Sequence, residues 1–324
     1  MTAKLRCVLL DDFQGAALRS ADWSAVADEV DLVTVREHPA DQAALLAQLA
    51  GADMAVTLRE RIAFPRAVFE RLPRLRLLVA SGMRNAAVDM EAARGHGVAV
   101  CGTPSGSAPP VELTWALLLG LARNTTEENG NLVSGGAWQS TVGTDLYGST
   151  LGVLGLGNIG SSVARIALAF GMDVQAWSHN LTAERCAEVG VRKAESLKGL
   201  LGGSDFVSVH LKLGPRTTAL LGREELALMR PGAFLVNTSR SAIVDQAALA
   251  ECLRAGSIAG AGLDVFDTEP LPADDPLRGT PRLLATPHLG YVTRNNLAAY
   301  YGGAVEDIRA FLDRSPIRVL NPAP

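Results

Sequence analysis

The feature that most constrains this chain is a glycine-rich turn between a predicted strand and a predicted helix. Residues 151–154 are apolar and run directly into Gly-Leu-Gly-Asn-Ile-Gly at 155–160, which an amphipathic stretch follows. Gly155 permits the tight turn, Gly157 lets a pyrophosphate approach the backbone, and Gly160 lets the helix pack against the strand. The helix start offers free N–H groups and a positive dipole end. The motif predicts a dinucleotide-binding turn, with contacts from Gly155, Gly157, Asn158, Ile159 and Gly160.

Length and composition are those of a globular protein with two domains. The chain has 324 residues, of which 48% are hydrophobic and 20% charged. The net charge of −4, without a block of like charges, gives no electrostatic case for nucleic acid or an anionic membrane as a partner. No signal peptide or membrane-spanning segment is recognisable, so we expect a cytoplasmic protein. Free thiols and no metal site are expected from the scattered cysteines Cys7, Cys101, Cys186 and Cys252.

The first part of the chain predicts a small α/β domain of its own. Strands that alternate with helices indicate a parallel sheet with both faces covered. Strands are expected at 4–10, 30–35, 53–58, 76–80 and 98–101, and helices at 16–27, 41–49 and 65–72.

Two polar turns of this domain follow predicted strands, at 58–61 and 81–85. Ligands of open α/β sheets bind outside the carboxyl ends of the strands, so these turns are candidates to line a substrate site. Glycine at the second turn permits a nest of N–H groups. The backbone N–H groups of Ser81 and Gly82 are therefore predicted to hold an anion.

The second part of the chain predicts a doubly wound sheet. A punctuated segment at 102–110 is typical of a domain crossing, and a helix at 111–123 is apolar nearly all round, which predicts burial. A looser region is expected at 124–148. Six strands are expected after residue 150, at 151–154, 173–177, 205–211, 233–237, 259–265 and 283–286, with helices at 184–189, 223–229, 246–255 and 295–312.

The position that distinguishes NAD from NADP departs from the usual pattern. A dinucleotide fold places Asp or Glu about 20 residues beyond the glycines, where it bonds the adenosine ribose. Here Ser178 stands at the end of the second strand. A neutral serine does not repel a 2′-phosphate, so NADP is an option, although no Arg or Lys is there to hold the phosphate. In the alternative, Ser178 bonds the ribose of NAD.

Three polar residues follow strands of the second part: Arg240, Glu269 and His288. Singly, each suits an ordinary surface or loop position. Together at the carboxyl side of one sheet they match a hydride-transfer site. Arginine binds a carboxylate in a fork, and histidine exchanges the proton of a hydroxyl group. A glutamate beside the histidine orients the ring and favours its protonated form.

In combination, these motifs resemble the D-isomer-specific 2-hydroxyacid dehydrogenase family over nearly the whole chain. The resemblance implies two Rossmann-like or flavodoxin-like doubly wound parallel-sheet domains with a cleft between them. It implies a discontinuous substrate domain, residues 1–103 plus 292–324, and a dinucleotide-binding domain, residues 104–291, in a homodimer. The segments that carry it are 155–160, Val209-His210-Leu211, Val236-Asn237-Thr238-Ser239-Arg240, Asp264-Val265-Phe266-Asp267-Thr268-Glu269-Pro270 and Pro287-His288-Leu289-Gly290.

The resemblance also assigns roles. It implies Arg240 as the substrate-binding arginine, His288 as the acid/base and Glu269 as its paired carboxylate. The backbone amides of Ser81 and Gly82 would hold the substrate carboxylate. The substrate would be a small 2-hydroxy or 2-keto acid and the cofactor NAD, with NADP possible. Further cofactor contacts are expected at Ser178, His210, Thr238, Asp264 and Gly290.

Two other functions stay open at this point. A phosphite dehydrogenase shares the triad residue types, and a non-catalytic NAD(H)-sensing co-regulator shares the fold. Glu269 instead of Gln argues against the formate-oxidising branch. The substrate side chain is undecided, because the loops at 59–64 and 82–87 mix chemistries. A second anionic group would suit Arg59, Arg61 and Arg84, and an apolar group would suit Phe64 and Met83.

Overall fold

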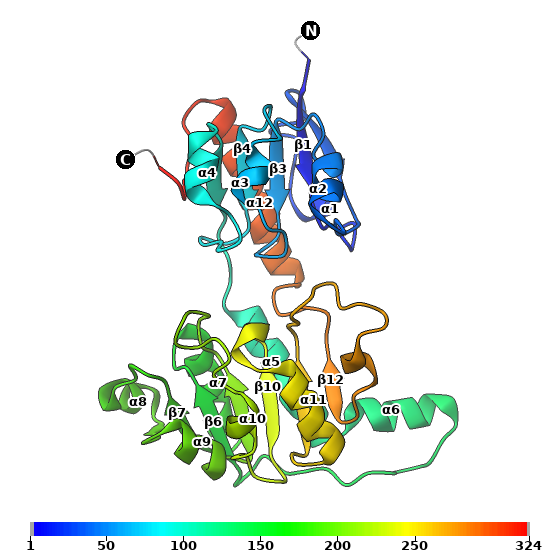
Figure 1. The fold of residues 1–324 in the computed structure, drawn as a ribbon, viewed down its shortest axis with the longest axis vertical. Coiled ribbons are helices and arrows are strands. Elements are labelled where there is room, and N and C mark those ends of the chain that lie inside the picture. The colour runs from blue at the N-terminus through cyan, green and yellow to red at the C-terminus, as the bar shows by residue number, and fades with distance from the viewer. Residues whose placement is uncertain (1–2, 323–324) are drawn as a thin grey trace. The chain divides into compact units, whose positions relative to one another are not determined.

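The computed structural model describes residues 3–322, and the chain divides into two compact units. Unit 1 comprises Met1–Gly106 with Val292–Pro324, and unit 2 comprises Ser107–Tyr291. The last helix, α12 (Arg294–Leu312), packs against β4 and α1 of unit 1, although more than 200 residues separate it from them in the chain (Figure 1). Both units are parallel α/β sheets, which confirms the predicted fold class.

Unit 1 has a five-stranded parallel sheet of order β2-β1-β3-β4-β5, the flavodoxin-like order. All residues of β3 and β4 are buried, as expected of apolar strands in a covered parallel sheet. The strands are β1 (Leu5–Leu9), β2 (Val30–Thr34), β3 (Met54–Thr57), β4 (Leu77–Ala80) and β5 (Ala99–Gly102). The helices besides α12 are α1 (Ala17–Ser20), α2 (Gln42–Gln48), α3 (Arg66–Phe69) and α4 (Met90–Gly95).

Unit 2 has a seven-stranded parallel sheet of order β12-β11-β10-β9-β6-β7-β8. The strand order reverses between β6 and β9, which is where doubly wound sheets bind ligands. The strands are β6 (Thr150–Leu154), β7 (Asp173–Trp177), β8 (Arg192–Lys193), β9 (Phe206–Val209), β10 (Phe234–Asn237), β11 (Gly260–Leu263) and β12 (Leu283–Ala285). The helices are α5 (Ala108–Ala122), α6 (Thr125–Ser134), α7 (Asn158–Ala169), α8 (Ala183–Val189), α9 (Leu197–Gly203), α10 (Arg223–Leu226) and α11 (Gln246–Ala255), with short 3-10 turns at Ser241–Ile243 and Pro276–Gly279.

Helix α5 is apolar nearly all round because it is enclosed within unit 2. It packs on β10 and β11 and against α7. Gly262 of β11 admits this close approach, since a Cβ there would stand 3.2 Å from the Leu117 side chain. The burial predicted for this helix is confirmed, with Leu117 and Leu118 almost fully enclosed.

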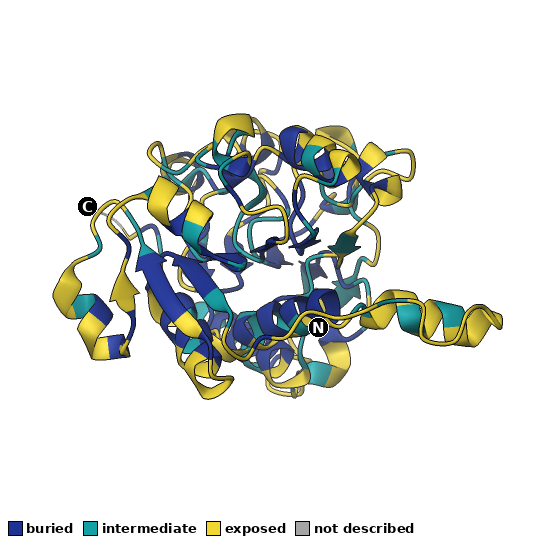
Figure 2. Ribbon diagram, turned by 90° about the horizontal axis from the view of Figure 1, so that it is seen from below, coloured by how far each residue is buried: buried dark blue, intermediate teal, exposed yellow. Residues whose placement is uncertain are grey.

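Helix α6 was not predicted, because the sequence indicated only a looser region at 124–148. Its large apolar residues are only Leu132 and Val133, which are adjacent, so the apolar periodicity that reveals helices is missing. None of its residues is buried (Figure 2). The segment after it is held to the helix by Glu128. The Glu128 carboxylate accepts hydrogen bonds from the Thr141 N–H and hydroxyl groups, each at 2.6 Å.

Other predicted elements also differ from the structure. The helix expected at 16–27 is only α1, because a turn in which Asp22 accepts the Ser24 N–H follows it. Two short helices, α4 and α9, and the two-residue strand β8 were not predicted. These elements are too short to show a periodic pattern, and unit 2 therefore has seven strands instead of six.

The C-terminal segment of unit 1 covers its edge strand β5. Asn321 accepts the Val100 N–H at 2.8 Å and donates to the Val98 carbonyl at 2.9 Å. Arg318 anchors the segment to α12 through its Nε, which donates to the fully buried Asp307 at 3.0 Å. Burial raises the pKa of Asp307 to about 7, although the Arg318 charge opposes that rise.

Asp307→Asn is expected to change how stability depends on pH. Because the pKa of Asp307 is raised on folding, its contribution is greatest below the ordinary value of 3.8 and is lost as the pH rises through about 7. Urea unfolding at several pH values between these limits should show a fall in the free energy of unfolding with pH that is smaller in the variant. Equal slopes in the two proteins would contradict this assignment.

Candidate active site

The glycine turn after β6 is closed on its inner side and open on its outer side. Gly155 has a φ of +95°, which a side chain rarely adopts. A Cβ at Gly160 would lie 2.0 Å from the Gly155 carbonyl oxygen, so only glycine fits there. A Cβ at Gly157 would meet no atom within 4 Å. The space above Gly157 is therefore accessible to a ligand.

The start of α7 supplies the groups that bind an anion. The first bond within the helix runs from the Ser161 N–H to the Gly157 carbonyl at 2.9 Å. The N–H groups of Asn158, Ile159 and Gly160 have no acceptor anywhere in residues 3–322. Three N–H groups at a helix start, with open space above Gly157, fit the pyrophosphate of a dinucleotide.

His210 forms the neighbouring wall of this turn at the end of β9. Its N–H donates to the Leu154 carbonyl at 2.7 Å, and its own carbonyl oxygen would be 2.8 Å from a Cβ at Gly155. Burial lowers the pKa of His210 to about 4, so its ring is neutral near pH 7. Three other predicted cofactor positions directly follow strands: Ser178 after β7, Thr238 after β10 and Asp264 after β11.

Residues Arg240, Glu269 and His288 follow β10, β11 and β12, which are neighbours in the sheet. The Nδ1 atom of His288 lies 2.5 Å from Oε2 of Glu269. The other Glu269 oxygen accepts the Phe266 N–H at 3.0 Å, which fixes the carboxylate. Because Nδ1 faces the carboxylate, Nε2 is the ring nitrogen that remains for proton exchange. About a fifth of each side chain is exposed.

The backbone of His288 is held in an unusual conformation by Asp264. His288 has a φ of +53°, which is uncommon outside glycine. The carboxylate of Asp264, 1% exposed, accepts hydrogen bonds from the N–H groups of Leu289 and Gly290 at 2.6 and 2.8 Å. The Thr286 hydroxyl donates to the same carboxylate at 2.7 Å. Burial raises the pKa of Asp264, and these hydrogen bonds counteract the rise.

Asp264 and Gly290 were predicted only as cofactor contacts, so their contact with one another was missed. Asn237 was missed as well. Its side chain accepts the Ser239 N–H at 3.0 Å and donates to the Arg240 carbonyl at 2.9 Å. The available signal was a polar residue at the end of an apolar strand, because a buried polar group needs a partner.

The residue after Arg240 does not require the backbone freedom of glycine. Ser241 begins a 3-10 turn and has no positive φ. The Arg240 guanidinium donates from Nη1 to the Ser239 carbonyl at 2.8 Å. Serine is therefore accommodated without backbone strain.

In unit 1, the N–H groups predicted to hold an anion are already used. The Ser81 N–H donates to the Thr57 carbonyl at 3.0 Å, which continues the pairing of β4 with β3. The Gly82 N–H donates to the Thr103 hydroxyl at 3.1 Å. The next N–H groups, of Met83, Arg84 and Asn85, have no acceptor among residues 3–322. The N–H groups of this turn that are available to a ligand therefore begin at Met83, directly after the predicted pair Ser81 and Gly82.

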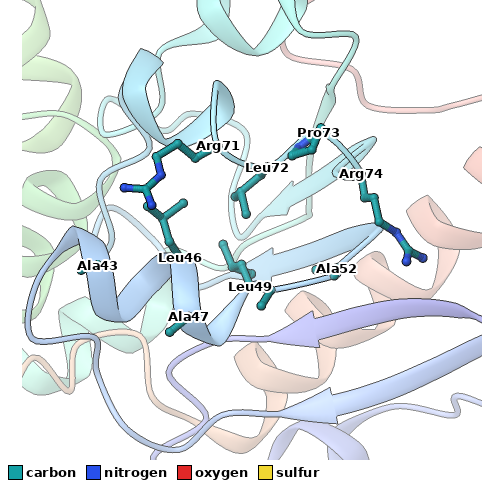
Figure 3. Close-up of a pocket in the computed structure, with 11 residues that line it drawn as sticks. Ala43, Leu46, Ala47, Leu49, Ala52, Arg71, Leu72, Pro73 and Arg74 are labelled. Carbon is teal, nitrogen blue, oxygen red and sulfur yellow. The ribbon is translucent and has the colours of Figure 1, made fainter.

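A surface hollow of about 450 Å³ lies elsewhere in unit 1 (Figure 3). Its lining comes from α2 and from the turns that precede β3 and β4, including Ala52 and Arg74. It is therefore at the amino ends of these strands, at the edge of the sheet opposite to Ser81 and Gly82. This hollow is not part of the candidate active site.

Comparison with known proteins decides the family. The sequence model described as "D-isomer specific 2-hydroxyacid dehydrogenase, NAD binding domain" matches residues 115–290. The chain belongs to this family. Residues 115–290 lie within unit 2, so the glycine turn and the ends of β10, β11 and β12 are parts of a family NAD-binding domain.

Relatives in this family carry several substrate names. The glyoxylate reductase of Aeropyrum pernix is 39% identical over 254 residues, 75% of each chain. The D-3-phosphoglycerate dehydrogenase of Methanocaldococcus jannaschii is 36% identical over 271 residues, 83% of this chain and 51% of its own. This chain spans about half the length of the phosphoglycerate dehydrogenases that it matches. The crystal structure of a phosphoglycerate oxidoreductase from Vibrio cholerae superimposes with a TM-score of 0.90 at 29% identity, covering 96% of this chain and 99% of the other.

Two glycine variants separate cofactor binding from folding. Gly157→Ala should leave the melting temperature unchanged, because its Cβ meets nothing, but it should weaken NADH binding by filling the approach to the α7 amides. Gly160→Ala should lower both the melting temperature and the affinity for NADH, because its Cβ collides with the Gly155 carbonyl. Calorimetric titration with NADH and thermal unfolding measure the two effects. Unchanged NADH affinity in Gly157→Ala would contradict this placement of the pyrophosphate.

Proposed function

We propose that this protein transfers a hydride between a nicotinamide dinucleotide and a small 2-hydroxy acid, with the 2-keto acid as the oxidised partner. The observation that carries the proposal is the His288–Glu269 pair, at 2.5 Å, on the sheet whose glycine turn fits a dinucleotide. Arg240 follows the adjacent strand of that sheet. The names of the relatives, glyoxylate reductase and phosphoglycerate dehydrogenase, support the same substrate class.

Each residue has a defined task in keto-acid reduction. The N–H groups of Met83 and Arg84, in the turn that Ser81 and Gly82 begin, bind the substrate carboxylate. Arg240 contacts that carboxylate and the C2 oxygen. Protonated His288 donates from Nε2 to the C2 oxygen as it gains negative charge, and Glu269 stabilises the imidazolium until then. The dinucleotide, when bound at the glycine turn, supplies the hydride.

The domain roles follow from these tasks. We assign residues 104–291 to dinucleotide binding and residues 1–103 with 292–324 to the substrate. Ser178 at the end of β7 carries no charge, so the adenosine ribose meets neither an acid that would repel a 2′-phosphate nor a base that would hold it. NAD is the proposed cofactor, with NADP as the alternative. The four free thiols suit a reducing compartment, and we propose the cytoplasm.

The alternatives have less support. A phosphite dehydrogenase would use the same residue types, and a co-regulator would need the fold without the chemistry. The relatives reported above are named for organic acid substrates, which favours the 2-hydroxy acid class over both.

His288→Ala tests the proposed role directly. Loss of a general acid reduces turnover by roughly 10²–10⁴-fold. We therefore expect a loss of that size in kcat for keto-acid reduction, while NADH affinity stays near that of the unmodified protein. His96→Ala, directly after α4 of unit 1, is the control and should keep its turnover. Full turnover in His288→Ala would contradict the role of the histidine.

We also propose a homodimer formed through α6 and the segment that follows it, residues 125–147, which we call the arm. Most of the arm is exposed (Figure 2). Its exposed side chains include large apolar ones, among them Val133 at 78%, Trp138 at 79% and Val142 at 96%. Such clustered exposure is unusual in a monomer. Glu128 holds the arm in a defined shape, so the apolar groups are presented together. A second copy of this chain is the proposed partner.

Polar substitution in the arm should separate the subunits. Val133→Ser combined with Trp138→Ser removes apolar surface that only a partner would cover, so the molar mass from light scattering should fall from that of a dimer to that of a monomer. Leu18→Ser in unit 1 removes a side chain that is 50% exposed and serves as the control. A monomeric unmodified protein would contradict the proposal.

A further inference from the structure

Unit 1 holds a second pair of a histidine and a carboxylate, formed by His38 and Asp11. Asp11 follows β1 and His38 follows β2, which are neighbours in the sheet, so the pair lies at the carboxyl edge. Nδ1 of His38 is 3.1 Å from Oδ1 and 3.2 Å from Oδ2 of Asp11. As in the His288–Glu269 pair, Nδ1 faces the carboxylate and Nε2 lies on the other side of the ring. The function proposed above gives this pair no task.

Two consecutive aspartates after β1 have different partners. Asp12 accepts the N–H groups of Ala16 and Ala17 at 2.6 and 3.1 Å and so fixes the start of α1. Asp11 has a φ of +56°, which aspartate adopts more readily than most residues. Its side chain is fully buried, and among residues 3–322 its carboxylate accepts a hydrogen bond only from His38. The strained backbone therefore directs Asp11 to the histidine.

The Nε2 atom of His38 is available to a ligand. It makes no hydrogen bond with residues 3–322, and 17% of the side chain is exposed. Because the buried carboxylate of Asp11 needs a donor, Nδ1 carries a proton. Nε2 then accepts a hydrogen bond when the ring is neutral and donates one when it is protonated. A hydroxyl group suits both states, since it can donate and accept.

The charge of the pair does not favour an anion as the ligand. With a protonated ring the pair is neutral, and with a neutral ring it is negative. A neutral hydrogen-bonding group is therefore the partner that Nε2 accommodates in either state.

The pair lies beside the turns expected to line the substrate site. The loop after β1 contacts the turn after β3, because the Arg61 guanidinium lies 5.0 Å from the centre of the Phe13 ring. Strands β1 and β4 both neighbour β3. Adjacent strands are about 4.8 Å apart, so the ends of β1 and β4 are separated by roughly 10 Å. A ligand that reaches from the amides of Met83 and Arg84 to His38 needs a side chain of several atoms.

The apolar groups that the sequence offered for the substrate side chain are reduced to one. Phe64 is fully buried, with its ring 6.1 Å from that of Phe69 in the core of unit 1, so it lines no surface. Met83 is 49% exposed in the turn after β4. A side chain with an apolar body beside Met83 and a polar end at His38 fits these positions.

We propose that His38, positioned by Asp11, binds a hydroxyl group at the far end of the substrate's side chain. This inference rests on the proposed function, which places the substrate carboxylate at the amides of Met83 and Arg84. The substrate class is then a 2-keto acid whose side chain is several atoms long and ends in a hydroxyl group. A site that hydrogen-bonds a substrate hydroxyl discriminates against the analogue that lacks it.

The test compares kcat/KM within pairs of 2-keto acids that differ by one hydroxyl group. The long pairs are 4-hydroxyphenylpyruvate with phenylpyruvate and 5-hydroxy-2-ketovalerate with 2-ketovalerate; the short pair is hydroxypyruvate with pyruvate. The unmodified protein should prefer the hydroxylated acid in at least one long pair, by about tenfold, because a hydrogen bond to a charged group is lost in the other member. The short pair should show no such preference, since its hydroxyl group does not reach His38.

Two variants separate the contact with substrate from the contact with Asp11. His38→Asn keeps an amide N–H near the position of Nδ1, so it should keep the melting temperature, but it has no group at Nε2. It should therefore lower the preference for the hydroxylated acid by about tenfold. His38→Gln places its amide near the position of Nε2 and withdraws the donor from Asp11. It should lower the melting temperature and keep more of the preference than His38→Asn does.

His96→Asn is the matched control. Nδ1 of His96 donates to the Ala92 carbonyl at 2.8 Å, directly after α4 and before β5. The same substitution there removes a second Nε2 atom away from the carboxyl edge, and it should leave the preference unchanged. A purely structural role of His38 would leave the preference unchanged in His38→Asn as well.

The outcomes distinguish this inference from the proposed function. Turnover without a preference in either long pair, a preference in the short pair alone, or an unchanged preference in His38→Asn would each overturn this inference and leave the proposed function standing. Absence of turnover with every 2-keto acid would overturn the proposed function and this inference with it.

Discussion

The buried carboxylate of Asp264 joins the ends of β11 and β12 and sets the geometry of the candidate site. It collects three donors from the segment that carries His288, at 2.6 to 2.8 Å. Desolvation of this carboxylate is unfavourable, and the three hydrogen bonds compensate for it. The result is a histidine with a left-handed backbone whose ring meets Glu269. The catalytic assignment therefore depends on a residue that need not touch the substrate.

The two units follow the same physical rule. Parallel strands bring their carboxyl ends to one edge, and both units place fixed, polar or strained residues there. In unit 1, adjacent strands end near Asp11 and Arg59, with φ of +56° and +55°. Asp11 is buried, and its Oδ1 lies 3.1 Å from Nδ1 of His38, so this edge is fixed by polar contacts as well. In unit 2 the corresponding edge carries the glycine turn and His288. Strain at these edges is consistent with groups held ready for a ligand.

The sequence predicted what depends on local pattern. The glycine turn, the apolar strands and the enclosed helix α5 all have local signatures, and the chain order of strands and helices allowed two parallel sheets to be expected. Helix α6 was missed because it has no apolar face. The amides of Ser81 and Gly82 were misjudged because their acceptors, Thr57 and Thr103, are distant in the chain. The bond between Asp264 and the His288 segment spans about 25 residues and likewise has no local signature. Hydrogen-bond partners of this kind are brought together only by the tertiary fold, so a local sequence pattern does not predict them.

The proposed hydride transfer is tested most directly by identifying the product of keto-acid reduction. Oxidation of NADH and of NADPH would be followed by the absorbance of the reduced nicotinamide with glyoxylate, pyruvate, hydroxypyruvate and 2-ketoglutarate, and the configuration of each chiral product would be determined. We predict turnover with at least one acid and a D-2-hydroxy acid as the product. Turnover to the L-isomer, or cofactor binding without oxidation by any 2-keto acid, would contradict it.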